Sequence, residues 1–290
     1  MMSEWSEIAQ HIAEITGQPF TLKSVDRVGG GCINDAVVLV GGERSWFVKF
    51  NHRSRLDMFE AEADGLSELR ATGAVRGPEV IDCGVMNGQA YIDLERLDLE
   101  ATSRKTEQQF GAQLADLHRN TQEQFGWFRD NTIGMTPQHN PLENDWIEFF
   151  RKHRLGFQVD LAISNGYGAE ITQLAGRLAR RLPDLFVAYK PEASLLHGDL
   201  WGGNWGSVDG EPVIFDPAVY YGDRETDIAM TMVFGGFGKS FYEAYEASWP
   251  LAPGHERRIK LYQLYHILNH LNLFGRSYLG RAVSLLRELT

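Results

Sequence analysis

The spacing of apolar residues changes near Arg96, and this change limits the possible folds more than any other feature. Before Arg96, short runs of β-forming residues are separated by turn signals such as Gly41-Gly42 and Asn87-Gly88. After Arg96, apolar residues mostly recur at the three- and four-residue steps of helices. The sequence therefore predicts an α+β fold of two lobes, β-rich at the N-terminus and mostly helical at the C-terminus.

The individual elements follow from the same patterns. In the first part we expect helices at 3–16 and 57–70 and strands at 21–28, 33–40, 44–50, 78–85 and 90–97. In the second part, helical periodicity covers 105–119, 142–163, 168–182, 226–234, 238–247 and 255–288, and only 195–216 resembles strand and loop. We place the boundary after Arg96, which gives domains at residues 1–96 and 97–290.

Charge and cysteine content exclude several classes of protein. The 28 Lys and Arg against 39 Asp and Glu give a net charge of −11, which argues against a general nucleic-acid binder. No run approaches the roughly 20 apolar residues that a membrane-spanning helix needs, and the first residues lack the apolar core of a signal peptide. Cys32 and Cys83 are the only cysteines, which favours a reducing compartment, so we expect a cytoplasmic protein.

One stretch concentrates polar chemistry. LLHGDLWGGN, residues 195–204, places Asn204 five residues after Asp199, and Asp216 follows twelve residues later at the end of an apolar run. Kinase sites use this pattern, in which one Asp accepts the proton of a hydroxyl group while an Asn and a second Asp bind Mg²⁺ beside ATP. Carboxylate and amide oxygens are the ligands that Mg²⁺ prefers. We therefore predict Asp199 as the catalytic base and Asn204 and Asp216 as magnesium ligands.

A simpler alternative is a polar turn between two strands, in which His197 and Asp199 only cap backbone groups. Glycines at 198, 202 and 203 allow the loop to bend tightly enough for the polar side chains to face one site. The combined spacing favours the catalytic interpretation.

A kinase site also needs a cover for the phosphates and a cation beside them. The stretch VGGGCIN lies between two expected strands, and its Gly29, Gly30, Gly31 and Cys32 are candidate nucleotide-binding residues. The motif is incomplete, and a flexible turn explains it about as well. Lys49, in WFVKF on the next strand, could pair with the phosphates, or it could extend from an exposed strand face.

The lysine needs an acidic partner on the following helix. Glu62 shares a helical face with Phe59 and Leu66, whereas Glu60 falls on the solvent side. An acid on an apolar face needs a counter-charge. The pattern therefore predicts an ion pair between Lys49 and Glu62.

The run YYGDRETDIAM comes soon after Asp216 and leaves no room for the long activation segment of a protein kinase. Without that platform for peptides, a small molecule or small adduct is the more natural acceptor. Asp227 lies near the start of an expected helix, where it could be a simple cap or could brace the catalytic loop. We favour the bracing role slightly.

These stretches resemble the fructosamine kinase (ketosamine-3-kinase) family, which has the bilobal fold of protein kinases and aminoglycoside phosphotransferases. The matching stretches are GGGCIN, FVKFN, MFEAEADGL, LADLHR, FGWFRDNTIGMTPQHN, DWIEFFRKHRLGFQ, LLHGDLWGGN, FDPAVYYGDRETDIAM and LYHILNHLNLFGRSYL. The long middle match, at 125–158, lies outside the generic kinase parts and separates this family from other small-molecule kinases.

The resemblance implies that ATP binds between the lobes with its adenine near a hinge at Asp93 to Arg96. Asp93 and Glu95 thus join Lys49 and Glu62 as expected nucleotide-binding residues. It also implies phosphorylation of the sugar 3-hydroxyl of a ketosamine, a sugar joined to an amine by glycation. The 3-phosphate then decomposes and restores the amine, which is deglycation repair. Two alternatives stay open: a phosphotransferase for another hydroxylated amine, aminoglycoside- or choline-like, and a non-catalytic kinase-like nucleotide-binding protein.

Trp201 closely follows Asp199. Its ring could cover the apolar face of a sugar or contact a cationic amine, or it could fill the protein core. The surrounding glycines leave little core to fill and favour a substrate contact.

Three other candidates carry less weight. Cys32 could act as a redox switch in the glycine-rich turn, or it could be only a small residue that fits there. His266 and His270 have the spacing of a metal-binding pair but no third ligand in sight. His118 is expected to pack within a helix.

Overall fold

The computed structural model describes residues 2–29, 33–42 and 44–290. The chain divides into two compact units. Unit 1 comprises Met1–Ala101 and Gly206–Phe215, and unit 2 comprises Thr102–Trp205 and Asp216–Thr290. Residues 206–215 therefore cluster with the β-rich unit although they lie far along the sequence.

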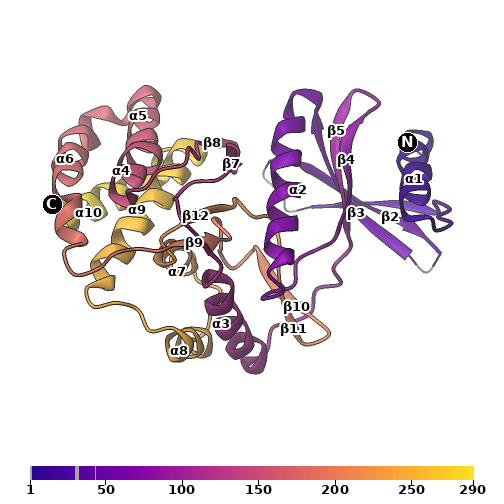
Figure 1. The fold of residues 1–290 in the computed structure, drawn as a ribbon. Helices are drawn as coiled ribbons and strands as arrows, with labels where there is room; N and C mark the ends of the chain where they lie inside the picture. The colour runs from indigo at the N-terminus through magenta and orange to yellow at the C-terminus, as the bar shows by residue number, and fades with distance from the viewer. Residues whose placement is uncertain (1, 30–32, 43) are drawn as a thin grey trace. The chain divides into compact units, whose positions relative to one another are not determined.

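Unit 1 is built on a five-stranded antiparallel sheet with the strand order β1-β2-β3-β5-β4. The strands are β1 Ser24–Val28, β2 Asp35–Gly41, β3 Arg44–His52, β4 Val80–Met86 and β5 Gln89–Glu95. Helix α1, Met2–Thr16, lies on one face of this sheet, and helix α2, Leu56–Ala71, lies on the other (Figure 1).

Strand β3 shows how both faces of the sheet become apolar. Val48 joins the core under α1, which includes Ile12, and Phe47 packs against the core under α2, which includes Phe59. Successive strand side chains point to opposite faces, so a sheet covered on both sides needs consecutive apolar residues. Asn87 and Gly88 join β4 to β5 with φ values of 52° and 79°, which is the hairpin turn that the sequence predicts.

A second hairpin completes unit 1. Strands β10, Trp205–Val208, and β11, Glu211–Ile214, pair with each other. An isolated bridge joins Val213 to Arg76, and another joins Ser207 to Glu100. These bridges tie the hairpin to segments that precede it by more than a hundred residues.

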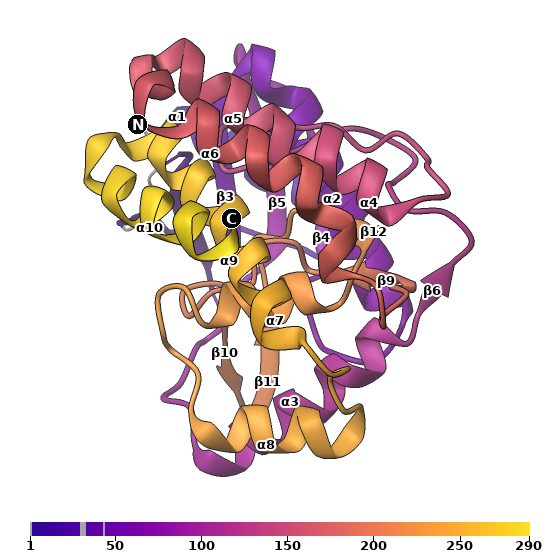
Figure 2. The same cartoon turned by 90° about the vertical axis from the view of Figure 1, so that its left-hand side faces the viewer.

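Unit 2 is mostly helical. Its helices are α3 Arg104–His118, α4 Trp146–Phe149, α5 Phe157–Ala162, α6 Gly168–Arg181, α7 Glu225–Thr231, α8 Lys239–Ser248, α9 His255–Phe274 and α10 Leu279–Leu289. Its strands are β6 Thr121–Gln122, β9 Ala193–Leu196 and β12 Tyr220–Gly222, in the order β12-β9-β6, and the hairpin of β7 Asn131–Ile133 and β8 Thr136–Gln138. Figure 2 shows α8 along α3, and α7 beside α9.

The predicted α+β fold, with a β-rich first part and a helical remainder, is confirmed, and two helical predictions need correction. The segment 142–163 holds two short α-helices joined by a wider π-helical stretch, Phe150–Gly156. The segment 255–288 is interrupted at Gly275, whose φ of 89° and ψ of −165° lie in a region open essentially to glycine. Among the described residues, no helix is long and apolar enough to cross a membrane.

Candidate active site

In unit 1, the predicted ion pair between Lys49 and Glu62 is present. Lys49 Nζ lies 2.5 Å from Glu62 Oε1, and Lys49 is only 7% exposed. Glu62 lies on the face of α2 whose Phe59 and Leu66 are fully buried, as the helical pattern indicates. The alternative of a lysine extending from an exposed strand face is therefore wrong. A buried ammonium needs such a partner because an unpaired charge is costly to remove from water.

The glycine-rich turn is described only in part. Val28 pairs with Ala36, so the segment between them connects two antiparallel neighbours. Gly29 lies at its described edge. The predicted roles of Gly30, Gly31 and Cys32 fall outside the described residues, so both the phosphate cover and the redox switch stay predictions.

The two predicted hinge residues have other surroundings. Asp93 on β5 is 0% exposed, so its side chain lies away from the surface, and its part in nucleotide binding stays a prediction. Glu95 accepts hydrogen bonds from Arg76 Nη2 at 2.5 Å and from the Glu79 backbone N–H at 3.1 Å. Its carboxylate therefore holds the end of β5, and its nucleotide contact stays a prediction.

Asp93 carries a fully buried carboxyl group. Neither of its side-chain oxygens has a hydrogen-bond partner among the described residues. Burial, followed by the negative charge of Asp82, raises the pKa of Asp93 well above its usual range. Asp82, in contrast to Asp93, has side-chain partners, because it accepts a hydrogen bond from Tyr91 at 2.6 Å and lies 2.9 Å from His11.

Asp93→Asn is expected to stabilise the fold increasingly as pH rises from about 4 toward 8. The unfolded chain loses the Asp93 proton near its usual pKa, whereas the folded chain retains it, so wild-type stability falls with pH across this window. The variant has no such loss, and its relative gain is at most about 1.4 kcal/mol per pH unit. Urea unfolding at several pH values measures the gain, with exposed Asp26→Asn as the control. A pH-independent difference would contradict the buried, protonated carboxyl group.

In unit 2, the three predicted catalytic and metal-binding residues lie together around one amide. Asn204 Nδ2 donates to the backbone oxygen of Asp199 at 2.9 Å and to that of Asp216 at 3.3 Å. Asp199 Oδ2 lies 3.4 Å from the same nitrogen. These contacts hold Asp216, where the chain returns to unit 2, next to the catalytic loop. The alternative of an ordinary polar turn does not require this convergence.

The donor set fits a magnesium ion. Asp216 is exposed, and the amide nitrogen of Asn204 faces three protein oxygens, which leaves its amide oxygen on the other side of the carboxamide. Carboxylate and amide oxygens are suitable Mg²⁺ ligands. Asp216 has a φ of 56°, a left-handed conformation that is unusual for a residue with a side chain.

The surroundings of Asp199 disfavour the ionised form of its carboxyl group. Burial, then the negative charges of Asp216 and Asp227, raise the pKa of Asp199 to about 7, and the Asn204 amide opposes this shift. A carboxyl group with a pKa near the working pH is well suited to accept a proton.

Asp227 braces the catalytic loop, which is the role that the sequence favours over a simple helix cap. Its carboxylate accepts hydrogen bonds from the backbone N–H groups of His197 at 2.7 Å and Gly198 at 2.9 Å. Fully buried His118 lies beside it, with Nε2 at 3.2 Å. Burial alone would raise the pKa of Asp227, but the contacts with His118 and the loop hold it below its usual value. His118 is thus a packed residue of α3 that supports this brace.

Gly198 is required by both its conformation and its neighbours. Its φ is 84°, and a Cβ atom would lie 1.9 Å from the backbone oxygen of Ala218. The Ala218 N–H also donates to the His197 oxygen at 2.8 Å. The catalytic loop is therefore packed directly against the segment that follows Asp216.

Gly198→Ala is expected to cost more stability than alanine at another glycine with positive φ. Gly210 is the matched control, because its φ is 79° and a Cβ atom there would meet nothing within 4 Å. Alanine at either site meets about 1–2 kcal/mol of backbone strain. The collision with Ala218 should add at least about 2 kcal/mol for Gly198→Ala, measured by urea unfolding. Equal losses in the two variants would mean that the loop can move away from Ala218.

Trp201 is at the surface. It is 40% exposed and meets Phe234 edge-on, with ring centroids 6.3 Å apart. Phe234 lies 4.5 Å from the ring of His270, which lies 5.3 Å from Tyr278. The alternative of a core tryptophan is therefore wrong, and the substrate contact stays a prediction.

The His270 Nδ1 atom contacts the backbone oxygen of His266, which is fully buried.

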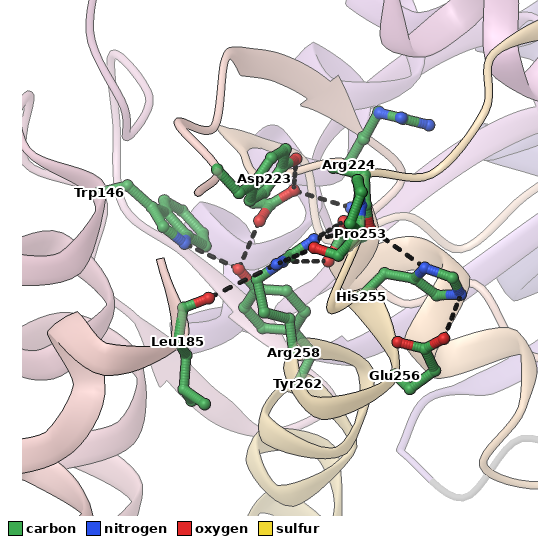
Figure 3. A network of polar contacts seen from close by, with 12 residues as sticks. Trp146, Leu185, Asp223, Arg224, Pro253, His255, Glu256, Arg258 and Tyr262 are labelled. Carbon is green, nitrogen blue, oxygen red and sulfur yellow. Dashed lines mark hydrogen bonds and ion pairs between the residues drawn. The ribbon is translucent and has the colours of Figure 1, made fainter. Parts of the chain in front are cut away.

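A buried ionic network supports α7, the helix that carries Asp227 (Figure 3). Arg258 on α9 forms two 2.8 Å hydrogen bonds to Glu225. Tyr262 donates to Asp223 at 2.5 Å, and Arg224 donates to the Pro250 oxygen at 2.6 Å. None of the motifs described above predicts this network. Its trace in the sequence is the run DRETD within YYGDRETDIAM, five consecutive polar or charged residues directly before an apolar run.

Comparisons with known proteins identify the family of this chain. The chain matches the sequence model of the fructosamine kinase family over residues 4–290. A probable ketoamine kinase from Synechocystis sp. is 44% identical over 287 residues, which are 98% of this chain and 96% of that protein. A chloroplastic protein-ribulosamine 3-kinase from Oryza sativa subsp. indica is 42% identical, covering 94% of this chain and 80% of that protein.

Solved structures give the same result. A crystal structure from Haemophilus somnus 129PT, named as a fructosamine-3-kinase, has a TM-score of 0.91 and 30% identity and covers 99% of this chain and 97% of that chain. The aminoglycoside phosphotransferase APH(4)-Ia has a TM-score of 0.62 at 15% identity, covering 100% of this chain and 98% of that one, and shares the fold. The predictions of a kinase-like fold and a phosphotransferase are confirmed. The chain belongs to the fructosamine kinase family.

Proposed function

We propose that this chain transfers the γ-phosphoryl group of ATP to the 3-hydroxyl of the sugar in a ketosamine. The observation that carries the proposal is the group of Asp199, Asn204 and Asp216 around one amide. Relatives named ketoamine kinase and protein-ribulosamine 3-kinase support the substrate class. The 3-phosphate would decompose and release the amine, so the biological role would be deglycation repair.

In this mechanism Asp199 orients the sugar hydroxyl and accepts its proton as the oxygen bonds to phosphorus and the bond to ADP breaks. Asn204 and Asp216 would hold Mg²⁺, which offsets the charge of the phosphates. Lys49, fixed by Glu62, would contact phosphate oxygens. We assign nucleotide binding to residues 1–96 and catalysis with acceptor binding to residues 97–290.

Trp201 is our candidate for direct contact with the acceptor. Its exposed ring and its neighbour Phe234 offer apolar and π surface two residues after Asp199. Such a surface suits the apolar face of a sugar or a cationic amine. The acceptor could be a small molecule or a glycated lysine of a protein.

We place the reaction in the cytoplasm. Only two cysteines occur in the chain, which suits a reducing compartment. The bacterial relatives are compatible with this location, whereas the rice relative is named chloroplastic.

The test is Mg²⁺-dependent ATP consumption by the purified full chain. Fructoselysine and ribuloselysine are the ketosamine acceptors, and an aminoglycoside panel and choline are the competing classes. We expect consumption with a ketosamine and mass-spectrometric detection of its phosphorylated product. Turnover only with aminoglycosides or choline would assign a different acceptor. No turnover with any acceptor, despite ATP binding, would support the non-catalytic alternative.

The kcat/KM for the ketosamine is expected to level off above about pH 7 and to fall at lower pH by up to about tenfold per pH unit, with the fall beginning below pH 7 to the extent that Mg²⁺ offsets the charge of Asp216. Asp199 must be unprotonated to accept the hydroxyl proton, and its pKa is about 7. Initial rates between pH 5 and 9 at saturating Mg²⁺ and ATP give the profile. A profile that is flat down to pH 5 would contradict a raised pKa at the base.

A further inference from the structure

The middle segment at 125–158 contains none of the residues assigned to catalysis or metal binding. Within it, the hairpin β7–β8 lies against the chain that follows Asp216. Gln138 Nε2 donates to the Ala218 oxygen at 3.1 Å, and Asn131 Nδ2 donates to the Val219 oxygen at 2.7 Å. Two consecutive peptide groups after Asp216 are thus held by side chains of one hairpin.

The Ala218 peptide links this hairpin to the catalytic loop. Its N–H donates to the His197 oxygen at 2.8 Å, and its carbonyl oxygen accepts from Gln138. The Ala218 oxygen also packs closely against Gly198 of the catalytic loop, because a Cβ atom at Gly198 would lie only 1.9 Å from that oxygen. A displacement of Ala218 would therefore also displace the backbone at Asp199 and at Asp216.

Asp216 needs such a restraint. Its φ of 56° is a conformation that a residue with a side chain keeps only where its surroundings impose it. Asn204 contacts the Asp216 oxygen from one side at 3.3 Å. Gln138 and Asn131 fix the chain two and three residues further on.

The chemistry of the site requires an amide at position 138. Gln138 is 2% exposed. Its nitrogen donates to the Ala218 oxygen and, at 2.9 Å, to Asn131 Oδ1, while its oxygen accepts from the Tyr265 hydroxyl at 2.8 Å. A carboxylate would set lone pairs against two acceptors, and an apolar side chain would deprive the Ala218 oxygen and the Tyr265 hydroxyl of the partner that Gln138 gives them.

We propose that Gln138 is a positioning residue that holds Asp216 in the conformation in which it binds the catalytic metal. The proposal rests on the proposed function, since it takes Asp216 as a magnesium ligand. Gln138 acts through Ala218 and does not itself contact substrate.

Gln138→Met tests this directly. We expect the Mg²⁺ concentration for half-maximal activity to rise about tenfold and kcat to fall, with little change in the KM for the ketosamine. Gln158→Met is the matched control, because Gln158 is a buried glutamine of the same unit that contacts Asn269 and Asn272 on α9. A purely structural role would give both variants the same loss of stability and the same unchanged Mg²⁺ dependence.

A milder variant covers the case in which Gln138→Met does not fold. Asn131→Asp keeps the acceptor for Gln138 and replaces the donor to the Val219 oxygen with a carboxylate oxygen, which repels that carbonyl group. Its Mg²⁺ requirement should rise a few-fold. Unchanged Mg²⁺ dependence in every variant that folds would overturn the inference.

A binding measurement separates this inference from the proposed function. ADP titrated with and without Mg²⁺ reports the metal site without any acceptor. Wild-type protein that shows no Mg²⁺ effect on ADP binding would count against the metal ligands themselves. A wild-type effect that persists unchanged in Gln138→Met would refute the positioning role alone.

Discussion

Asp199→Ala is expected to fold and bind ATP but to lose phosphoryl transfer by about 10³-fold. The loss follows from removal of the group that accepts the hydroxyl proton and orients the hydroxyl oxygen. Stability should stay level or rise, because the wild-type fold keeps a carboxylate close to Asp216 and Asp227 against their repulsion. Single-turnover assays, ADP titration and urea unfolding measure the three quantities separately.

The control for this variant is Asp184→Ala, which removes an exposed carboxylate of unit 2 that forms an ion pair with exposed Arg181 at 3.3 Å. Exposed pairs of this kind contribute little, so all three quantities should match the wild type. Near-normal turnover by Asp199→Ala would remove Asp199 as the base. Loss of ATP binding together with turnover would assign it to nucleotide binding instead.

The parts of this molecule that the sequence predicts correctly are those with a local cause. The arc of Phe59, Glu62 and Leu66 marks the inner face of α2, and a lysine buried nearby has to pair with the acid on that face. The spacing of Asp199 and Asn204 within a glycine-containing loop predicts their contact in the same way. Each inference needs only the geometry of one element and the cost of an unpaired buried charge.

The errors have a different origin. The apolar repeat continues on both sides of Gly275, so periodicity alone gives no sign that the helix stops there. Strand β8 contains Pro137, and Gly134 precedes it, both of which argue against a strand. These short strands exist because Gln138 and Asn131 bond to residues far along the chain. No local pattern contains that information.

Asp93 shows the same limit. Its place in AYIDLE suggests an acid on the polar side of a half-exposed strand. In the fold, α1 and α2 cover opposite faces of the sheet, so both sides of β5 are buried. Whether one face of a strand is exposed to solvent depends on which helices pack against the sheet, and those helices are distant in the sequence.

Arg258→Met is expected to lower the free energy of unfolding by about 3–5 kcal/mol. Arg258 and Glu225 are 2% and 0% exposed in their side chains and share two hydrogen bonds of 2.8 Å. Removing the guanidinium leaves a buried carboxyl group whose pKa burial already raises to about 7 in the presence of Arg258. Urea unfolding gives the loss, and exposed Arg257→Met on the same helix is the control.

A second substitution tests whether this loss of stability comes from the buried Glu225 carboxyl group that Arg258→Met leaves without its guanidinium partner. Glu225→Leu combined with Arg258→Met removes both members of the pair, so no buried carboxylate remains. We expect the double variant to regain much of the stability that Arg258→Met loses, because replacing a whole buried pair with apolar residues is often neutral or favourable. A loss of less than about 1 kcal/mol in Arg258→Met would contradict this account, since a surface pair costs that little. Because Glu225 begins the helix that presents Asp227 to the catalytic loop, activity should follow stability across this series, whereas in the Asp199 variant it should not.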